Sequence, residues 1–201
     1  MSAKFSRRVL VSTLSSIGAF IAFSVSAQPQ GDKIDVARMT ASVFPLEKDA
    51  FKTVQGKIWS DQLPQVIQNR QALVKAVPNL KLPLATESFT ASIGTKDDRF
   101  VVSALNTSDC WSSSFIPNER ECPARLALVN GNVKILTEVQ SFPIAMVRGP
   151  AGFDASSNEK SSDRTEVLYN PANQTFSFEV FHNGESSGGP VQFFPKPKSA
   201  N

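Results

Sequence analysis

The sequence predicts an α+β fold in which two N-terminal helices precede an antiparallel sheet of about six to eight strands, all in a single domain. Three observations lead to this expectation. Apolar residues recur at helical spacing across residues 46–77. Segments rich in Val, Phe, Thr and Ile follow residue 83, and four of them flank two short turn sequences.

The helical part divides into two segments. The apolar positions of the first helix are Leu46, Ala50, Phe51, Val54 and Ile58. Gly56 weakens this helix because glycine loses more backbone entropy than other residues. Ser60 or Asp61 is expected to cap the second helix, with Pro64 tolerated in its first turn. Pro78 is expected to end it, since proline cannot continue a helix.

The strand part contains two hairpins. Residues 125–129 and 133–139 flank Asn130-Gly131-Asn132, and Asn-Gly accepts the positive φ angles of a tight turn. A second hairpin joins residues 165–169 to residues 175–181. Further strands are predicted at 99–105, 142–148 and 191–194. The positions Phe176, Phe178, Val180 and Phe181 break strict alternation, which predicts burial on both faces of that strand.

Residues 1–27 have the composition of an export signal, with basic residues first and an apolar run after them. Val25-Ser26-Ala27 places small residues where a signal peptidase needs them, so cleavage is expected after Ala27. The segment Ser6-Arg7-Arg8-Val9-Leu10-Val11 resembles the bacterial twin-arginine signal, although Ser12 stands where that signal often has Lys. A general secretory signal is the alternative. The expected product is a soluble periplasmic or secreted protein without a membrane anchor.

The expected mature domain covers residues 28–201, with a mobile loop near 149–164 and a frayed tail at 195–201. The whole chain has 21 basic and 18 acidic residues. Three of the basic residues (Lys4, Arg7 and Arg8) belong to the signal, so the mature chain is formally neutral. Proteins that follow a phosphate backbone need a basic face, and neutrality argues against nucleic acid as a partner.

Cys110 and Cys122 are the two cysteines of the chain, and an exported protein is expected to join them in a disulfide. The polar loop that they enclose contains large apolar residues. We expect four residues of this loop to contact a partner, because aromatic and arginine side chains are typical interface anchors. These candidates are Trp111, Phe115, Ile116 and Arg120. The alternative is that the apolar ones pack back onto the core.

No catalytic set is assigned from the sequence. Residues 184–188 match the G-x-S-x-G pattern of serine hydrolases, and His182 lies nearby. However, a strand-like segment follows where that pattern needs a helix, and His182 precedes Ser186. One His and two expected disulfide cysteines leave few zinc ligands, so neither a metal nor a cofactor is expected.

These features favour an exported, non-enzymatic protein-binding module, such as an inhibitor or an immunity-type protein. The expected partner is another envelope or secreted protein. Two alternatives stay open at this point. One is a small envelope hydrolase, and the other is a small-molecule or lipid-binding module with a cavity lined by phenylalanines.

Overall fold

The computed structural model describes residues 33–112, 119–145 and 162–194. The chain divides into two compact units, Met1–Gln30 and Gly31–Asn201, and the first of these lies outside the described residues. The expected cleavage site after Ala27, residues 149–161 of the expected loop and the tail at 195–201 also lie outside them. Arg164, the last residue of that expected loop, is the first residue of a strand.

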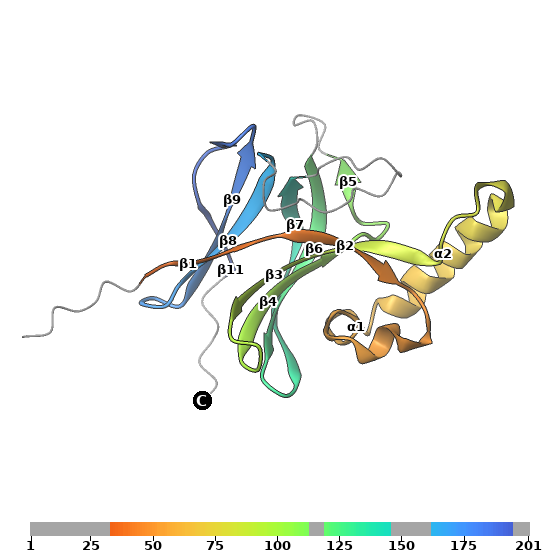
Figure 1. Ribbon diagram of the computed structural model, residues 1–201, viewed down its shortest axis with the longest axis horizontal. Coiled ribbons are helices and arrows are strands. Elements are labelled where there is room, and N and C mark those ends of the chain that lie inside the picture. Colours follow the sequence, from red (N-terminus) through yellow and green to blue (C-terminus); the bar gives the residue numbers. More distant parts are fainter. Residues whose placement is uncertain (1–32, 113–118, 146–161, 195–201) are drawn as a thin grey trace, which may run out of the picture. The chain divides into compact units, whose positions relative to one another are not determined.

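The second unit contains two antiparallel sheets (Figure 1). The smaller sheet has the order β1-β8-β9-β10, and β11 also pairs with β9. Its strands are β1 (Asp35–Arg38), β8 (Arg164–Asn170), β9 (Thr175–His182), β10 (Glu185–Ser186) and β11 (Val191–Phe194). The larger sheet has the order β2-β3-β4-β6-β5, and β7 also pairs with β6. Its strands are β2 (Thr40–Pro45), β3 (Ala85–Gly94), β4 (Arg99–Leu105), β5 (Trp111–Ser112), β6 (Glu119–Val129) and β7 (Val133–Ala145).

One extended segment, residues 35–45, belongs to both sheets. Its first part, β1, pairs with β8, and its second part, β2, pairs with β3. The change of sheet occurs at the buried Met39, whose backbone N–H donates to the carbonyl of Thr165 over 2.8 Å. The sequence prediction missed this segment. It was therefore wrong in placing the helices before all the strands, and in expecting one sheet of six to eight strands.

The space between the two sheets is filled by the larger of two apolar clusters. Its largest buried side chains are Phe89, Phe142, Phe176, Leu126, Ile144, Val102 and Val167. They come from β3, β4, β6 and β7 of the larger sheet and from β8 and β9 of the smaller one. Because successive side chains of a strand point to opposite faces, these strands leave a second set of residues on the other face of the larger sheet.

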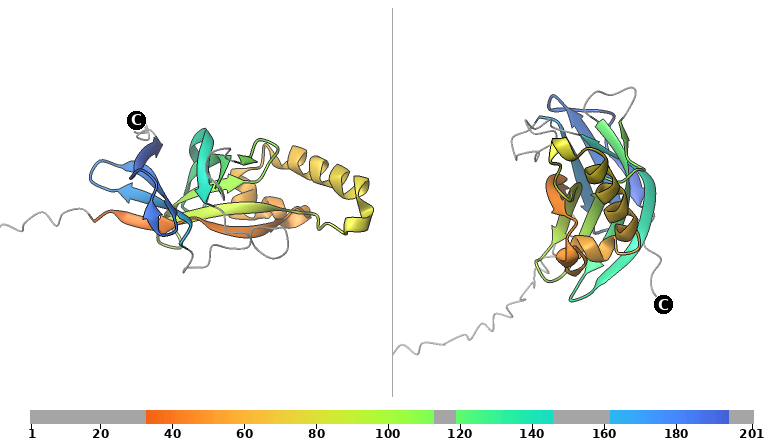
Figure 2. Two further views of the ribbon diagram at one scale, coloured as in Figure 1. Left: turned by 90° about the horizontal axis from the view of Figure 1, so that it is seen from above. Right: turned by 90° about the vertical axis from the view of Figure 1, so that its right-hand side faces the viewer.

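The helical segment packs on part of that other face. A 3-10 turn, η1 (Lys48–Lys52), leads into α1 (Val54–Ile58) and α2 (Leu63–Ala76), and a second one, η2 (Pro78–Leu80), follows. Figures 1 and 2 show α1 beside the larger sheet and α2 running outward past the end of its strands, both apart from β8 and β9. Ile58, Trp59 and Leu63 pack there on Leu105 and Ala127, which forms the second cluster. The strands β4 and β6 are thus buried on both faces.

The helical periodicity was correct, but the first helix is shorter than expected. Thr53 interrupts it, because its Oγ1 accepts the N–H of Gly56 and donates to the carbonyl of Ala50. The second helix has Gln62 at its N-cap, with no side-chain cap, in place of Ser60 or Asp61. The carboxylate of Asp61 instead binds an arginine, as described below. The end of α2 before Pro78 is confirmed.

Both predicted hairpins are confirmed. β6 and β7 pair from Val129 and Val133 onward, and Gly131 has a φ of 80°. The β7 strand continues through the expected separate strand at 142–148 as far as Ala145. In β9 the burial alternates: Phe176, Phe178 and Val180 are buried on one face, while Phe181 is half-buried. Full burial on both faces was wrong, because the side chains of the second face are only half-buried. On that face the Arg164 guanidinium lies over the Phe181 ring, 3.7 Å from its centroid.

Gly56 permits a close contact between the backbones of η1 and α1. A Cβ built at this position would lie 1.9 Å from the carbonyl oxygen of Ala50 and 2.7 Å from its carbon. Both atoms belong to the backbone of η1, so they cannot rotate away. From its sequence position, Gly56 was expected to weaken the helix. In the structure, the absence of a side chain at Gly56 is what lets η1 fold against α1.

We expect Gly56→Ala to destabilise the protein by about 1–3 kcal/mol, because overpacking displaces backbone that has no room to move. Urea unfolding of the mature chain measures this change. Lys57→Ala, at an exposed position of the same helix, is the control and should change stability by less than about 0.5 kcal/mol. Equal stability of Gly56→Ala and the wild type would contradict the packing described here.

Candidate functional site

The predicted disulfide is confirmed: Cys110 and Cys122 are bonded, with their Cα atoms 4.3 Å apart. Cys122 is fully buried in the core between the sheets, so the bond fixes the start of the enclosed loop to the protein interior. The short strand β5 follows Cys110 directly and pairs with β6 through Trp111 and Glu121 and through Ser112 and Arg120. Phe115 and Ile116, two of the predicted contact residues, lie outside the described residues.

Trp111 is 48% exposed and belongs to neither apolar cluster. Its neighbour across the strand pair is Glu121, whose carboxylate accepts a hydrogen bond from the Ser141 hydroxyl. Paired residues share one face of a ladder. Trp111, Glu121 and Ser141 therefore form a surface patch at the end of the larger sheet, here called the Trp111 patch.

Arg120, also predicted to bind the partner, does not belong to this patch. It pairs with Ser112 and so points to the opposite face from Trp111. There its Nη1 donates to Oε2 of Glu87 over 2.9 Å, and the Glu87 side chain is only 6% exposed. The same oxygen accepts from Asn106 Nδ2 over 2.8 Å. Arg120 thus connects β6 to β3 and to the loop before Cys110.

A groove of about 580 Å³ lies beside this loop. One wall is α2, from Gln62 to Leu73, and the other consists of residues 106–109. Four carboxamide side chains contribute to its lining: Gln62, Gln65, Asn69 and Asn106. This groove could not be predicted from the sequence, because its walls lie more than thirty positions apart in the chain.

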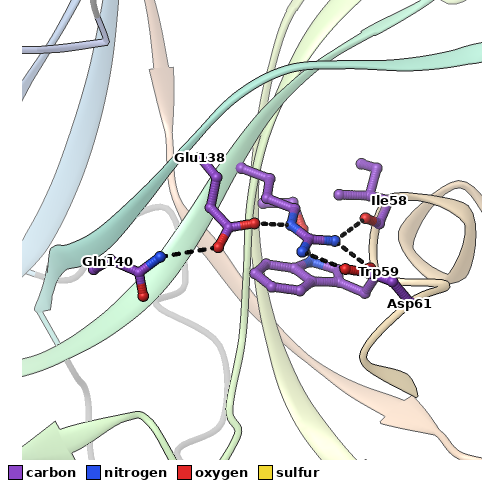
Figure 3. Close-up of polar contacts among 7 residues, drawn as sticks. Ile58, Trp59, Asp61, Glu138 and Gln140 are labelled. Atoms are coloured by element: carbon purple, nitrogen blue, oxygen red, sulfur yellow. Dashed lines mark hydrogen bonds and ion pairs between the residues drawn. The ribbon is translucent and has the colours of Figure 1, made fainter. Parts of the chain in front are cut away.

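A buried arginine holds the helices against the larger sheet (Figure 3). Arg125 lies on β6, and its side chain is 5% exposed. Its Nη1 and Nη2 donate to the two oxygens of Asp61 over 2.5 and 2.8 Å, and Nη1 also donates to the Ile58 carbonyl over 2.7 Å. On the other side, Nε donates to Glu138 Oε2 on β7 over 2.6 Å.

Trp59 completes this arrangement beneath the guanidinium. The Arg125 Cζ atom lies 4.4 Å from the centroid of the fully buried Trp59 ring, within the range of a cation–π contact. Trp59 Nε1 donates to Ser103 Oγ over 2.7 Å, and Ser103 donates to Gln55 Oε1 over 2.9 Å. We call Trp59, Asp61, Arg125 and Glu138 the Arg125 cluster.

The charges of this cluster stabilise one another. The hydrogen bonds from Arg125 lower the pKa of Asp61, although partial burial acts in the opposite direction. The hydrogen bonds to Asp61 likewise raise the pKa of Arg125, against the effect of its own burial. Both groups are thus held in their charged forms, and the cluster acts as a structural joint.

The Arg125 cluster was not predicted from the sequence. A signal for it was present, since Arg125 is the one charged residue in the otherwise apolar segment 122–129. Charged residues are almost never fully buried unless they are paired. A lone arginine in a strand covered on both faces therefore predicts an acidic partner for its side chain. The sequence does not indicate which acidic residue that partner is.

The structure does not bring Ser186 and His182 together as a catalytic pair. Ser186 Oγ accepts the N–H of Gly189 over 3.0 Å, which closes the turn after β10. His182 Nε2 instead lies 3.3 Å from Oε2 of Glu119, a residue of β6 that is nearly buried. The strand pairing also places Glu185, and not Ser186, opposite His182. These contacts give His182 a position between the two sheets.

Phe89, Phe142 and Phe176 are buried in the core between the sheets. One open hollow of about 360 Å³ borders this core at the end of the sheets. Phe100 and Tyr169 line it, with their ring centroids 5.2 Å apart. Asp35, Asp98 and Arg99 form its polar rim.

Within residues 33–112, 119–145 and 162–194, no three metal-ligating side chains converge. None of the helices in these ranges has the length and apolar character needed to cross a membrane. Comparisons of the chain with family models, with curated proteins and with solved structures return no match. Its function is therefore inferred from the residues and contacts described above.

We expect Arg125→Met to lower the free energy of unfolding by about 3 kcal/mol, because it leaves a buried carbonyl and a partly buried carboxylate without their donor. Thermal and urea unfolding of the purified protein measure the loss. Arg99→Met, at a half-buried position of the neighbouring strand, is the comparison and should lose less than half as much. Similar losses in the two variants would contradict the role of Arg125 as the joint.

We expect the stability difference between the wild type and Asp61→Asn to shrink as the pH falls. The folded state lowers the pKa of Asp61, so the stabilisation is complete above its unfolded pKa of about 3.9. It is lost as the pH falls through the lower, folded pKa. Urea midpoints at pH 6 and pH 2.5 test this, with Ser60→Ala as a non-titrating control. A difference that is constant or grows in acid would contradict it.

Proposed function

We propose that the chain is an exported, non-enzymatic protein-binding module that contacts another envelope or secreted protein through the Trp111 patch. The observation that carries this proposal is the exposure of Trp111, 48% on a two-residue strand next to a disulfide. Trp, Tyr and Arg are the residues that most often dominate binding energy at protein interfaces. An inhibitor or an immunity-type protein would use such a patch.

The mechanism that we propose depends on the rigidity of the patch. Cys110 is joined to a fully buried cysteine, and β5 is paired with β6 on the next two residues. Trp111 therefore sits on a backbone that is held in place before a partner arrives. Pre-organisation of this kind lowers the entropy that is lost on binding. A tryptophan adds a large apolar area at the cost of two side-chain torsions.

Arg120 supports the patch from its other face in this proposal. Its bond to the nearly buried Glu87 connects β6 with β3, so β5 and β6 are held on the sheet close to the disulfide. Phe115 and Ile116 stay part of the proposed contact surface, because the sequence places them in the same disulfide loop. The disulfide itself is the kind of bond that forms in an oxidising compartment, which agrees with export.

We expect Trp111→Ala to weaken binding of the partner by about tenfold, while the melting temperature stays nearly unchanged, because the side chain is exposed and outside the core. The tagged mature chain is used to isolate the partner from its own envelope extract without denaturant. Calorimetry with the purified partner then gives Kd for each variant.

Ile135→Ala is the matched control, since Ile135 is an exposed apolar residue (43%) on β7. It should bind the partner like the wild type. If Trp111→Ala and Ile135→Ala both bind like the wild type, the Trp111 patch is not the contact surface. A large fall in the melting temperature of Trp111→Ala would show that Trp111 belongs to the core.

A further inference from the structure

The groove beside the disulfide loop has one wall whose polar groups are regularly spaced. Gln62, Gln65 and Asn69 lie at positions i, i+3 and i+7 of the α2 segment, so they share one side of the helix. At a rise of 1.5 Å per residue they span about 10 Å along the helix axis. That distance corresponds to about three residues of an extended chain.

The opposite wall of the groove is held in place by the sheet. Asn106 donates its backbone N–H to the Glu87 carbonyl over 2.9 Å and its Nδ2 to the Glu87 carboxylate over 2.8 Å. The Asn106 carbonyl accepts from Thr86 Oγ1 over 2.7 Å. The disulfide at Cys110 follows within four residues. The groove is therefore formed before any ligand binds, and its volume lies in the range of known ligand sites.

We propose that this groove binds an extended polypeptide segment of the partner protein, and the inference rests on the protein-binding function proposed above. A carboxamide offers both a donor and an acceptor, which are the two groups that a peptide backbone presents. Gln65 Nε2 donates to Asn69 Oδ1 over 2.8 Å, and this bond leaves Gln65 Oε1 as an acceptor and Asn69 Nδ2 as a donor for the segment. Leu73 follows Asn69 by one turn on the same helix, lines the groove and is 44% exposed, so it can receive an apolar side chain of the segment. Among the described residues that line the groove none is aromatic, whereas a sugar ring binds best on an aromatic face.

The charges of the groove specify the segment further. Asp61, Arg70 and Asp109 contribute to the lining. The Asp61 carboxylate is bonded to Arg125, and Arg70 Nε donates to the Pro83 carbonyl over 3.0 Å. Arg70 keeps its positive charge on the helix wall, and Asp109 is exposed on the loop wall, so the loop wall of the groove is negative. Charge complementarity then favours a segment with a basic residue beside an apolar one.

The test selects peptides from a phage-displayed library of linear dodecapeptides on the full mature chain. Affinities of the selected synthetic peptides are then measured by fluorescence anisotropy. We expect the peptides to share a basic residue next to an apolar one. The double variant Gln65→Ala/Asn69→Ala should bind them about tenfold more weakly, because it removes two side chains that each hydrogen-bond the peptide.

Gln68→Ala/Gln71→Ala is the matched control, since both residues are exposed on α2 and neither lines the groove. It should bind like the wild type, and both double variants should fold because alanine is the best helix former. Asp109→Asn should weaken peptide binding and reduce its dependence on salt, while Asp97→Asn, in the turn between β3 and β4, should change neither.

Failure of this inference is distinguishable from failure of the proposed function. If the purified partner is lost by Trp111→Ala but kept by Gln65→Ala/Asn69→Ala, the groove inference is overturned and the Trp111 patch stands. If neither change affects the partner, the proposed function also falls. A library that yields no peptide, or peptides that bind both double variants equally, overturns the groove inference. Oligosaccharide binding that depends on Gln65 and Asn69 would overturn the inference, because it would show that the ligand of the groove is a glycan and not a peptide.

Discussion

The buried guanidinium of Arg125 is the contact on which the position of the helices depends. It comes from the larger sheet and bonds to the Ile58 carbonyl at the end of α1 and to Asp61 in the turn before α2. Removing a guanidinium from water is expensive, so the hydrogen bonds and the Trp59 ring must offset that cost. A smaller apolar residue at this position could fill the space, but it could not fix the helices at one distance and angle.

The two candidate surfaces depend on this joint and on the disulfide. Asp61, which Arg125 binds, stands at the start of α2, the helix that provides one wall of the groove. The disulfide and the Glu87 contacts position the other wall and the strand that carries Trp111. Groove and patch thus lie on the two ends of one short segment, residues 106–112, and a single partner could contact both. Binding at each of two linked places raises the total affinity without further contacts.

The sequence predicted those features that depend on neighbours in the chain. Asn130-Gly131 marks a tight turn by its own backbone preferences, and Pro78 ends a helix wherever it stands. Residues 35–45 could not be assigned in this way, because their strand partners are residues 166–169 on one side and 85–90 on the other. The disulfide followed from the cysteine count. The placement of Trp111 and Arg120 on opposite faces could not be predicted, because it is set by the register of a two-residue strand. The groove needed α2 and residues 106–109 to meet, which pattern alone does not show.

The most direct test of this account is native-state hydrogen exchange of the backbone amides in Arg125→Met, compared with the wild type and followed by mass spectrometry of peptic fragments. If Arg125 is the joint, amides of α1 and α2 should lose protection strongly, while those of β3, β4 and β6 should keep most of theirs. Unchanged protection of α2, or an equal loss across helices and sheet, would contradict the claim that this side chain holds the helices on the sheet.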